Sequence, residues 1–159
     1  MTAKLSISVT VNGTAHAAEV EPRLLLADFL RENLDMTGTH VGCEHGICGA
    51  CTVLMDGDSV RSCLTLAVQA DGASVETVES LGDIEALGPL QEAFREHHAL
   101  QCGFCTPGML MTAAELLAQK SEQSREDIRE FMSGNYCRCT GYHAIVDAIE
   151  SVNNTRLKG

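Results

Sequence analysis

The sequence predicts an α+β fold, in which a small N-terminal β-grasp domain (residues 1–80) precedes an all-α domain of four helices (residues 81–159). Two observations carry this expectation. Apolar residues alternate at strand period in the first half and recur at helical spacing in the second. Turn signals separate the segments of the first half, whereas helix-capping residues separate those of the second. The composition changes from one pattern to the other near Leu81.

The first half contains two predicted hairpins. Residues 4–20 alternate at strand period around Asn12-Gly13, a strong hairpin turn signal. A helix is expected over residues 24–33, where the apolar side chains fall on one side. The remaining strands are expected at residues 51–55, 60–63 and 73–78, with a turn at Asp56-Gly57 between the first two. Two hairpins, one helix and a last strand indicate a β-grasp, the architecture of plant-type ferredoxin-like 2Fe–2S domains.

The second half is expected to be helical after a linker over residues 79–88. One helix is predicted at residues 89–97. Thr106-Pro107 predicts the start of another, with Thr as N-cap and Pro in the first turn. Ser124 to Asp127 resembles a capping box that opens a third helix. The last helix is expected at residues 142–152, which completes a four-helix domain.

Composition narrows the function classes. The net charge of −11 argues against direct nucleic-acid binding, which needs a basic surface. We expect no membrane span, because the longest strongly apolar stretch is short and contains an aspartate. No secretory signal is visible, so we expect a cytoplasmic protein. Eight cysteines in a cytoplasmic chain of 159 residues point to bound metal rather than to disulfides.

The first cysteine set has the spacing of a plant-type 2Fe–2S site. Cys43, Cys48 and Cys51 form a C-x4-C-x2-C run, and Cys63 follows after eleven residues. A short loop can wrap a compact cluster and offer three thiolates, while the fourth approaches from another element. We expect that element to be the strand at residues 60–63. The alternative is a glycine-rich turn with purely structural cysteines.

Glycines alternate with the cysteines of this run. A 2Fe–2S cluster with four thiolates is anionic, so the loop must supply positive dipoles. Gly42, Gly46 and Gly49 are expected to take positive φ and turn backbone N–H groups toward sulfur.

The second set consists of Cys102, Cys105, Cys137 and Cys139. The first two precede a predicted helix N-terminus, where free N–H groups and the helix dipole favour an anionic thiolate centre. The last two are an i, i+2 pair that also precedes a helix, and in extended backbone their side chains point the same way. Spacing alone leaves two alternatives open, a structural zinc site and an iron–sulfur cluster.

Three motifs together resemble those of the iron–sulfur subunit of the molybdenum hydroxylases, the xanthine oxidase family. They read VGCEHGICGACTV from Val41, QCGFCTPGM from Gln101 and NYCRCTGY from Asn135. The resemblance covers about residues 4–152, and all eight cysteines fall in place. It implies one 2Fe–2S cluster distal to molybdenum on Cys43, Cys48, Cys51 and Cys63. It implies a second, proximal cluster on Cys102, Cys105, Cys137 and Cys139.

The resemblance also implies partners and a role. A large subunit would carry a molybdopterin cofactor, a medium subunit would carry FAD, and the whole would form a dimer of heterotrimers. Because the chain stops at Gly159, these partners are expected to be separate polypeptides. Electrons would pass from molybdenum through both clusters to FAD. Gln101 would contact the pterin across the subunit boundary, the alternative being an ordinary polar loop residue.

Two other functions remain possible from the sequence: a free-standing ferredoxin-like carrier and a zinc-stabilised structural module. Neither a Ser/His/Asp set nor a phosphate-binding glycine loop is visible, so we expect no bond chemistry on this chain itself. The substrate of the complex is not encoded here. Purines, aldehydes, N-heteroaromatics, carbon monoxide and aromatic thioesters are all used by members of the family.

Overall fold

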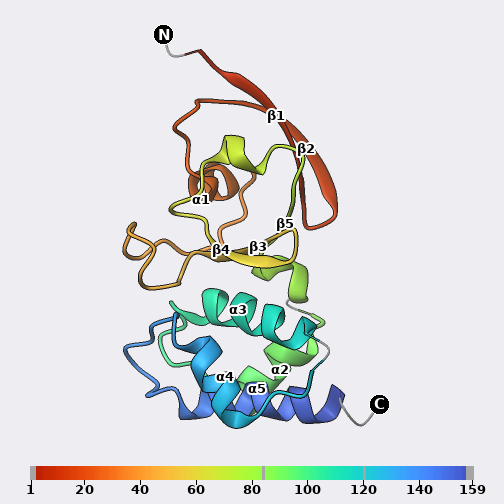
Figure 1. The fold of residues 1–159 in the computed structure, drawn as a ribbon, viewed down its shortest axis with the longest axis vertical. Coiled ribbons are helices and arrows are strands. Elements are labelled where there is room, and N and C mark those ends of the chain that lie inside the picture. The colour runs from red at the N-terminus through yellow and green to blue at the C-terminus, as the bar shows by residue number, and fades with distance from the viewer. Residues whose placement is uncertain (1–2, 84, 120, 157–159) are drawn as a thin grey trace.

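The computed structural model describes residues 3–83, 85–119 and 121–156. Figure 1 shows a sheet-containing half at the N-terminal end and a helical half at the C-terminal end, stacked along the long axis. This arrangement agrees with the predicted α+β fold, in which a sheet-containing half precedes a helical half.

The first half is built on one mixed sheet of five strands. Its order is β2-β1-β5-β3-β4, in which β1 and β5 run parallel and the other neighbours run antiparallel. The strands are β1 Leu5–Val11, β2 Thr14–Val20, β3 Thr52–Met55, β4 Asp58–Arg61 and β5 Ser74–Glu76.

Both predicted hairpin turns are confirmed by their backbone angles. Asn12 and Gly13 have φ of 49° and 79°, and Asp56 and Gly57 have φ of 53° and 95°. Two successive positive φ values give the turn whose twist matches that of the flanking strands. The residues on either side of the turns pair directly, so the turns set the strand register.

The helix expected over residues 24–33 is shorter than predicted. The α-helix α1 covers Leu26–Asp28, and Phe29–Asn33 continue as a π-helical turn. Residues before α1 pair instead with the segment after β4: the Ala67 amide donates to the Leu24 carbonyl, and Leu25 forms a bridge with Leu66. These long-range hydrogen bonds outweigh local helix propensity.

The second half contains four α-helices in its described residues. Helix α3 lies between the sheet and the other helices, and it packs against β3 on one side and against α2 and α4 on the other (Figure 1). Each half has its own apolar core. The helices are α2 Pro89–Glu96, α3 Thr106–Ala118, α4 Arg125–Met132 and α5 His143–Arg156.

Several predicted boundaries are wrong by a few residues. Strand β4 ends at Arg61, so Cys63 lies in the following turn rather than on the strand. Helix α3 begins at Thr106 itself, which makes Cys105 its N-cap. Within the predicted linker, residues up to Leu81 form a 3-10 turn, while Ile84 lies outside the described residues. The expected domain ends at residues 1 and 159 also lie outside them.

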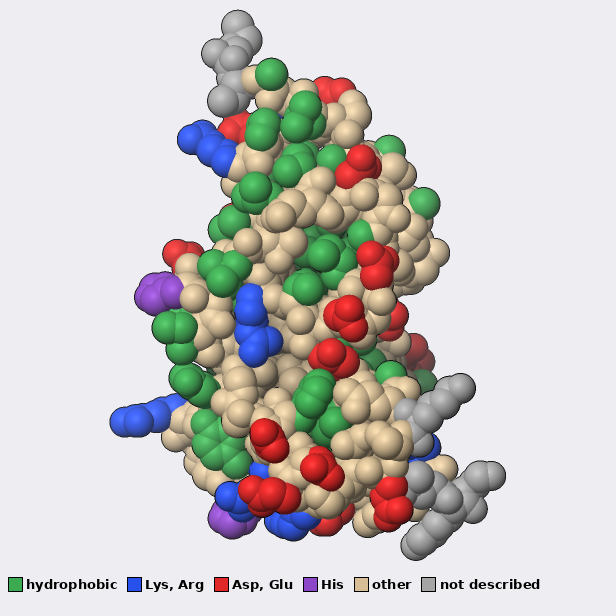
Figure 2. Space-filling view, in the orientation of Figure 1, with side chains coloured by type: hydrophobic (Ala, Val, Ile, Leu, Met, Phe, Trp, Pro, Cys, Tyr) green, Lys and Arg blue, Asp and Glu red, His purple; other side chains and the backbone are tan. Residues whose placement is uncertain are grey.

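The surface carries acidic side chains on both halves of the visible face (Figure 2). None of the helices in the described ranges has the length and apolar character needed to cross a membrane.

The two halves meet closely at Gly108, in the first turns of α3. A Cβ atom added there would lie 2.1 Å from the carbonyl oxygen of Gly49. Only a residue without a side chain allows α3 to approach the first cysteine loop so closely. The loop and the start of the helix that follows the second cysteine motif are therefore in direct backbone contact.

Candidate iron–sulfur centres

The first cysteine loop directs backbone amides at Cys43. The N–H groups of Cys48 and His45 donate to its Sγ at 3.4 and 3.5 Å. These two hydrogen bonds, with the Cys48 amide contributing most, lower the pKa of Cys43 to about 6. Hydrogen bonds to a charged form favour that form. The loop thus stabilises the thiolate, which is the form that binds metal.

Two of the four cysteines of the first set are buried. Cys51 and Cys63 are 2% and 4% exposed. Burial, followed by the neighbouring Cys51 thiol, raises the pKa of Cys63 to about 11. Two adjacent buried thiols resist being ionised together unless a bound cation offsets their charges. The pair therefore fits a site that holds a metal cation.

The predicted positive φ is confirmed at Gly46 and Gly49 and is wrong at Gly42. Gly46 and Gly49 both have φ of +76°, whereas Gly42 is not in the positive range and Glu44 is instead, at +56°. At Gly42 the constraint is space, because an added Cβ would lie 3.2 Å from both the Cys48 sulfur and the Phe104 ring.

The second set lies at the ends of two segments that lead into helices. Cys105 caps α3, and the Cys137–Cys139 pair precedes α5. The Sγ atoms of Cys102 and Cys139 are 3.5 Å apart, and both residues are exposed. Burial, followed by the adjacent Cys137 thiol, raises the pKa of Cys105 to about 12.

Cys137 is the second-set thiol that receives dedicated hydrogen bonds. Burial raises its pKa, but the Thr140 hydroxyl and amide donate to its Sγ at 3.1 and 3.4 Å, and the net pKa is lowered. The amide of Cys137 donates to the Tyr142 hydroxyl at 2.9 Å. These contacts fix the Cys137 loop ahead of α5.

All eight cysteines are free thiols, and each set divides into close pairs. The pairs are Cys43 with Cys48, Cys51 with Cys63, Cys102 with Cys139, and Cys105 with Cys137. Within the described ranges, no three His, Cys, Asp or Glu side chains are grouped as ligands of one metal ion. A 2Fe–2S cluster takes two thiolates on each iron, so paired thiols suit it.

Gln101 is exposed and directly precedes Cys102. Exposed apolar side chains lie beside it in the chain, with Leu100 41% and Phe104 49% exposed. The structure thus places Gln101 on an accessible, partly apolar surface next to the second cysteine set.

Several residues that connect the two sets were not predicted from the sequence. Asn135 is 2% exposed and bonds to the first loop, and the Tyr136 amide donates to the Cys48 carbonyl at 2.9 Å. Arg61 bonds to Asn135. Asn135 and Arg61 each lie two residues before a cysteine, which was the available sequence signal.

Family models match both halves of the chain. A 2Fe-2S iron-sulfur cluster binding domain matches residues 9–78, and a [2Fe-2S] binding domain matches residues 77–150. Together with the paired thiols, these matches define a protein with two 2Fe–2S clusters.

Similar proteins of known function cover nearly the whole chain. The gamma subunit of caffeine dehydrogenase from Pseudomonas sp. (strain CBB1) is 59% identical over 94% of this chain and 91% of its own length. The small subunit of nicotine 6-hydroxylase from Paenarthrobacter nicotinovorans is 58% identical over 92% and 88%. A chain of quinoline 2-oxidoreductase from Pseudomonas putida 86 superposes with a TM-score of 0.93, at 56% identity and 99% coverage of both chains.

The chain belongs to the iron–sulfur subunits of the molybdenum hydroxylases, the xanthine oxidase family. It is an electron-transfer subunit that does not itself catalyse the hydroxylation. Its cofactors are two 2Fe–2S clusters, and the similar caffeine dehydrogenase and nicotine 6-hydroxylase chains are each one subunit of a larger enzyme.

Proposed function

We propose that the chain carries electrons from a molybdopterin centre first to the second cysteine set and then to the first. Cys102, Cys105, Cys137 and Cys139 would hold the cluster proximal to molybdenum. Cys43, Cys48, Cys51 and Cys63 would hold the distal cluster, from which FAD on a partner is reduced.

The observation that carries this proposal is the pairing of eight free thiols into two sets whose loops touch. The Tyr136 amide, beside Cys137, donates to the carbonyl of Cys48. Bound 2Fe–2S clusters supply one-electron carriers. The chain's own residues hold them in place, direct amides at Cys43 and Cys137, and bury Cys51 and Cys63 away from water.

The surface around Gln101 is the proposed contact with the molybdenum subunit. Gln101 is exposed beside the exposed cysteines of the second set, Cys102 and Cys139, so a partner can reach all three. We propose that its amide binds the pterin. We further propose that a medium subunit carries FAD and that the complex is a dimer of heterotrimers. Both proposals follow from the family resemblance, which covers both cluster motifs.

The substrate of the complex is proposed to be a nitrogen heterocycle. Caffeine dehydrogenase, nicotine 6-hydroxylase and quinoline 2-oxidoreductase are named for such compounds, and their chains are 56–59% identical to this one. Aldehyde oxidoreductases match at a lower identity of 42–47%. The specificity pocket itself would lie on the large subunit.

We also propose two separate cluster domains, residues 1–80 and 81–159, with a four-helix arrangement in the second. The separate apolar cores of the two halves support this division. A cytoplasmic location is proposed because the eight cysteines fall in metal-binding motifs rather than in the disulfide framework of a secreted protein.

Metal analysis of the purified complex tests the proposal. We expect about four irons and four acid-labile sulfides per copy of this chain, since each cluster has two of each. The reduced complex should give two distinct EPR signals, because the two cysteine sets have different surroundings. Stoichiometric zinc without sulfide would contradict the proposal, and a native species of a lone 17 kDa chain would favour a free carrier.

A further inference from the structure

A buried asparagine joins three segments of the two halves. The Asn135 side-chain amide donates to the Gly49 carbonyl at 3.3 Å, and its Oδ1 accepts from Thr112 and Arg61, each at 3.1 Å. Gly49 belongs to the first cysteine loop, Thr112 to α3 and Arg61 to β4. An added Cβ at Gly49 would lie 2.7 Å from Asn135, so the absence of a side chain permits this contact.

Arg61 strengthens the same junction from the sheet side. Its Nη2 donates to the Gly134 carbonyl at 2.8 Å as well as to Asn135, and its Nη1 donates to the Thr52 hydroxyl at 2.5 Å. Within the described part of the chain its acceptors are all neutral oxygens. The guanidinium therefore acts as a rigid fork of donors rather than as half of an ion pair.

A hydrogen bond beside this junction links the two cysteine sets directly. The Tyr136 amide, directly after Asn135 and directly before Cys137, donates to the Cys48 carbonyl at 2.9 Å. One hydrogen bond thus joins a residue of the first set to the neighbour of a residue of the second. Electron tunnelling decays less steeply through bonds, including hydrogen bonds, than across gaps between atoms.

His40 and Phe104 form a second link between the two loops. The Phe104 ring stacks on His40 with centroids 5.0 Å apart, and the Phe104 carbonyl lies 2.9 Å from the His40 Nδ1. Phe104 is 49% exposed, whereas Asn135 is 2% exposed. This link rests on stacking and one exposed hydrogen bond, so it holds the loops less firmly than the buried junction.

We propose that Arg61 and Asn135 form a clasp that sets the electronic coupling between the two clusters, by holding the Tyr136 amide on the Cys48 carbonyl. They are positioning residues, since neither is a ligand. Each transfer oxidises one cluster by one electron and reduces the other by one, and no bond forms or breaks. The inference rests on the ligand sets proposed above.

The test compares substitutions of Arg61 in the intact complex. Arg61→Met removes the charge and the fork, whereas Arg61→Lys keeps the charge but loses the fork. Arg23→Met is the matched control, because Arg23 is 82% exposed and pairs only with Glu21 within the described residues. Phe104→Leu tests the second link, the contact between Phe104 and His40. Iron content, the magnetic splitting between the two clusters in the fully reduced state, and the rate of electron transfer between them are measured.

We expect both Arg61 variants to keep parental iron while showing an altered splitting and a several-fold slower transfer. Arg23→Met should match the parent, and Phe104→Leu should keep the parental splitting and the parental rate between the two clusters. Parental splitting and rate in the Arg61 variants would overturn the inference, as would slow transfer in Phe104→Leu alone. Loss of iron from both Arg61 variants would overturn it too, because Arg61 would then be needed for the fold itself. The parent's own iron, sulfide and EPR signals test the proposed function independently.

Discussion

Gly108 shows how one residue fixes the distance between two cofactor loops. Its Cα faces the Gly49 carbonyl so closely that an added Cβ would lie 2.1 Å from that oxygen. Backbone atoms on both sides leave little room to adjust. The close approach of α3 therefore depends on the missing side chain.

We expect Gly108→Ala to destabilise the protein, by more than about 1 kcal/mol, although glycine-to-alanine changes inside helices ordinarily stabilise by about 0.5–1 kcal/mol. The clash with Gly49 reverses the sign. The reverse change, Ala114→Gly on the same helix, is the control and should cost only about 1 kcal/mol through helix propensity. Thermal unfolding of the complex measures both, and a stabilised Gly108→Ala variant would refute the close contact.

Residues that act locally could be predicted from the sequence, whereas residues that act across the fold could not. The C-x4-C-x2-C spacing predicted the first ligand loop, and the structure places Cys43 where two loop amides reach it. Arg61 lies two residues before Cys63, but this position does not predict its contacts, because its partners Thr52 and Asn135 are brought to it only by folding. Its function depends on contacts between segments far apart in the chain.

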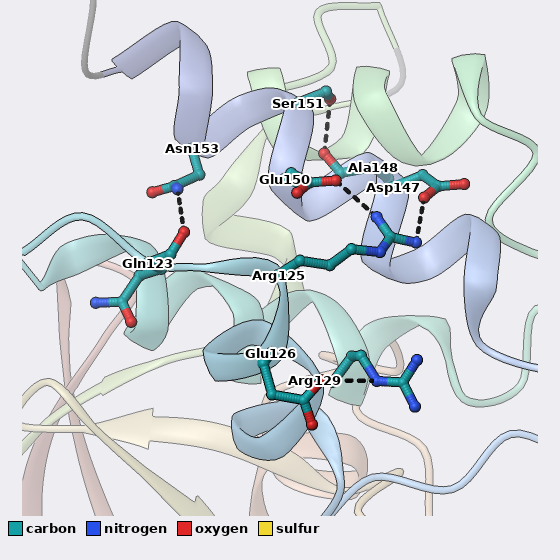
Figure 3. A network of polar contacts seen from close by, with 9 residues as sticks. All are labelled: Gln123, Arg125, Glu126, Arg129, Asp147, Ala148, Glu150, Ser151 and Asn153. Carbon is teal, nitrogen blue, oxygen red and sulfur yellow. Dashed lines mark hydrogen bonds and ion pairs between the residues drawn. The ribbon is translucent and has the colours of Figure 1, made fainter.

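Helix α4 is fixed at its start by a capping box and at its side by ion pairs. Ser124 and Asp127 exchange hydrogen bonds, with the Asp127 amide donating to the Ser124 hydroxyl at 3.2 Å. Arg125 reaches Asp147 and Glu150 on α5 at 2.7 and 2.6 Å (Figure 3). The sequence predicted the cap, but the ion pairs depend on how α4 and α5 pack.

The cap leads to a prediction with a defined pH dependence. The Ser124 hydroxyl, then its amide, lowers the pKa of Asp127 below its ordinary value. Because the pKa of Asp127 is lower in the folded protein, its carboxylate contributes fully to stability at pH values above its unfolded pKa of about 4. This contribution is lost as the pH falls through the folded pKa. We therefore expect Ser124→Ala to lower stability by about 1 kcal/mol, equally at pH 6 and pH 8.

Thermal unfolding at the two pH values checks this expectation, with Ser121→Ala as a control outside the helix. A cost that disappears between pH 8 and pH 6 would show that another titrating group governs the cap.

The segment around α1 shows why some element boundaries escape sequence analysis. The prediction of a helix over residues 24–33 was correct in kind but too long. The Leu26 and Ala27 amides donate instead to the carbonyls of Thr65 and Ser62. Those partners lie beyond β4 and are unknown until the sheet forms. The periodicity of apolar residues predicts that a helix is present, whereas long-range hydrogen bonds determine where it begins and ends.

For the whole molecule, the proposed order of the two clusters can be tested with one ligand substitution in each half. In the intact complex, Cys43→Ser should leave substrate able to reduce the second set's cluster while flavin reduction slows sharply. Cys105→Ser should block transfer nearer its source and leave the first set's cluster oxidised. Rapid-freeze EPR on both variants is the measurement.

Iron content serves as the control, because loss of a ligand can unfold a small metal domain. If Cys43→Ser stopped reduction of the second set while Cys105→Ser left reduction of the first set fast, the order of the clusters would be reversed.

The unequal burial of the two cysteine sets has a consequence for how the holoprotein is made in the cell. Cys51 and Cys63 are 2% and 4% exposed, whereas Cys102 and Cys139 lie at the surface. A scaffold protein that delivers iron and sulfide cannot reach these buried thiols once the chain has folded around them. We expect the first loop to be filled during folding and the second set afterwards, before a partner subunit covers it. Maturation and subunit assembly would then be sequential, with the exposed set as the last point of entry.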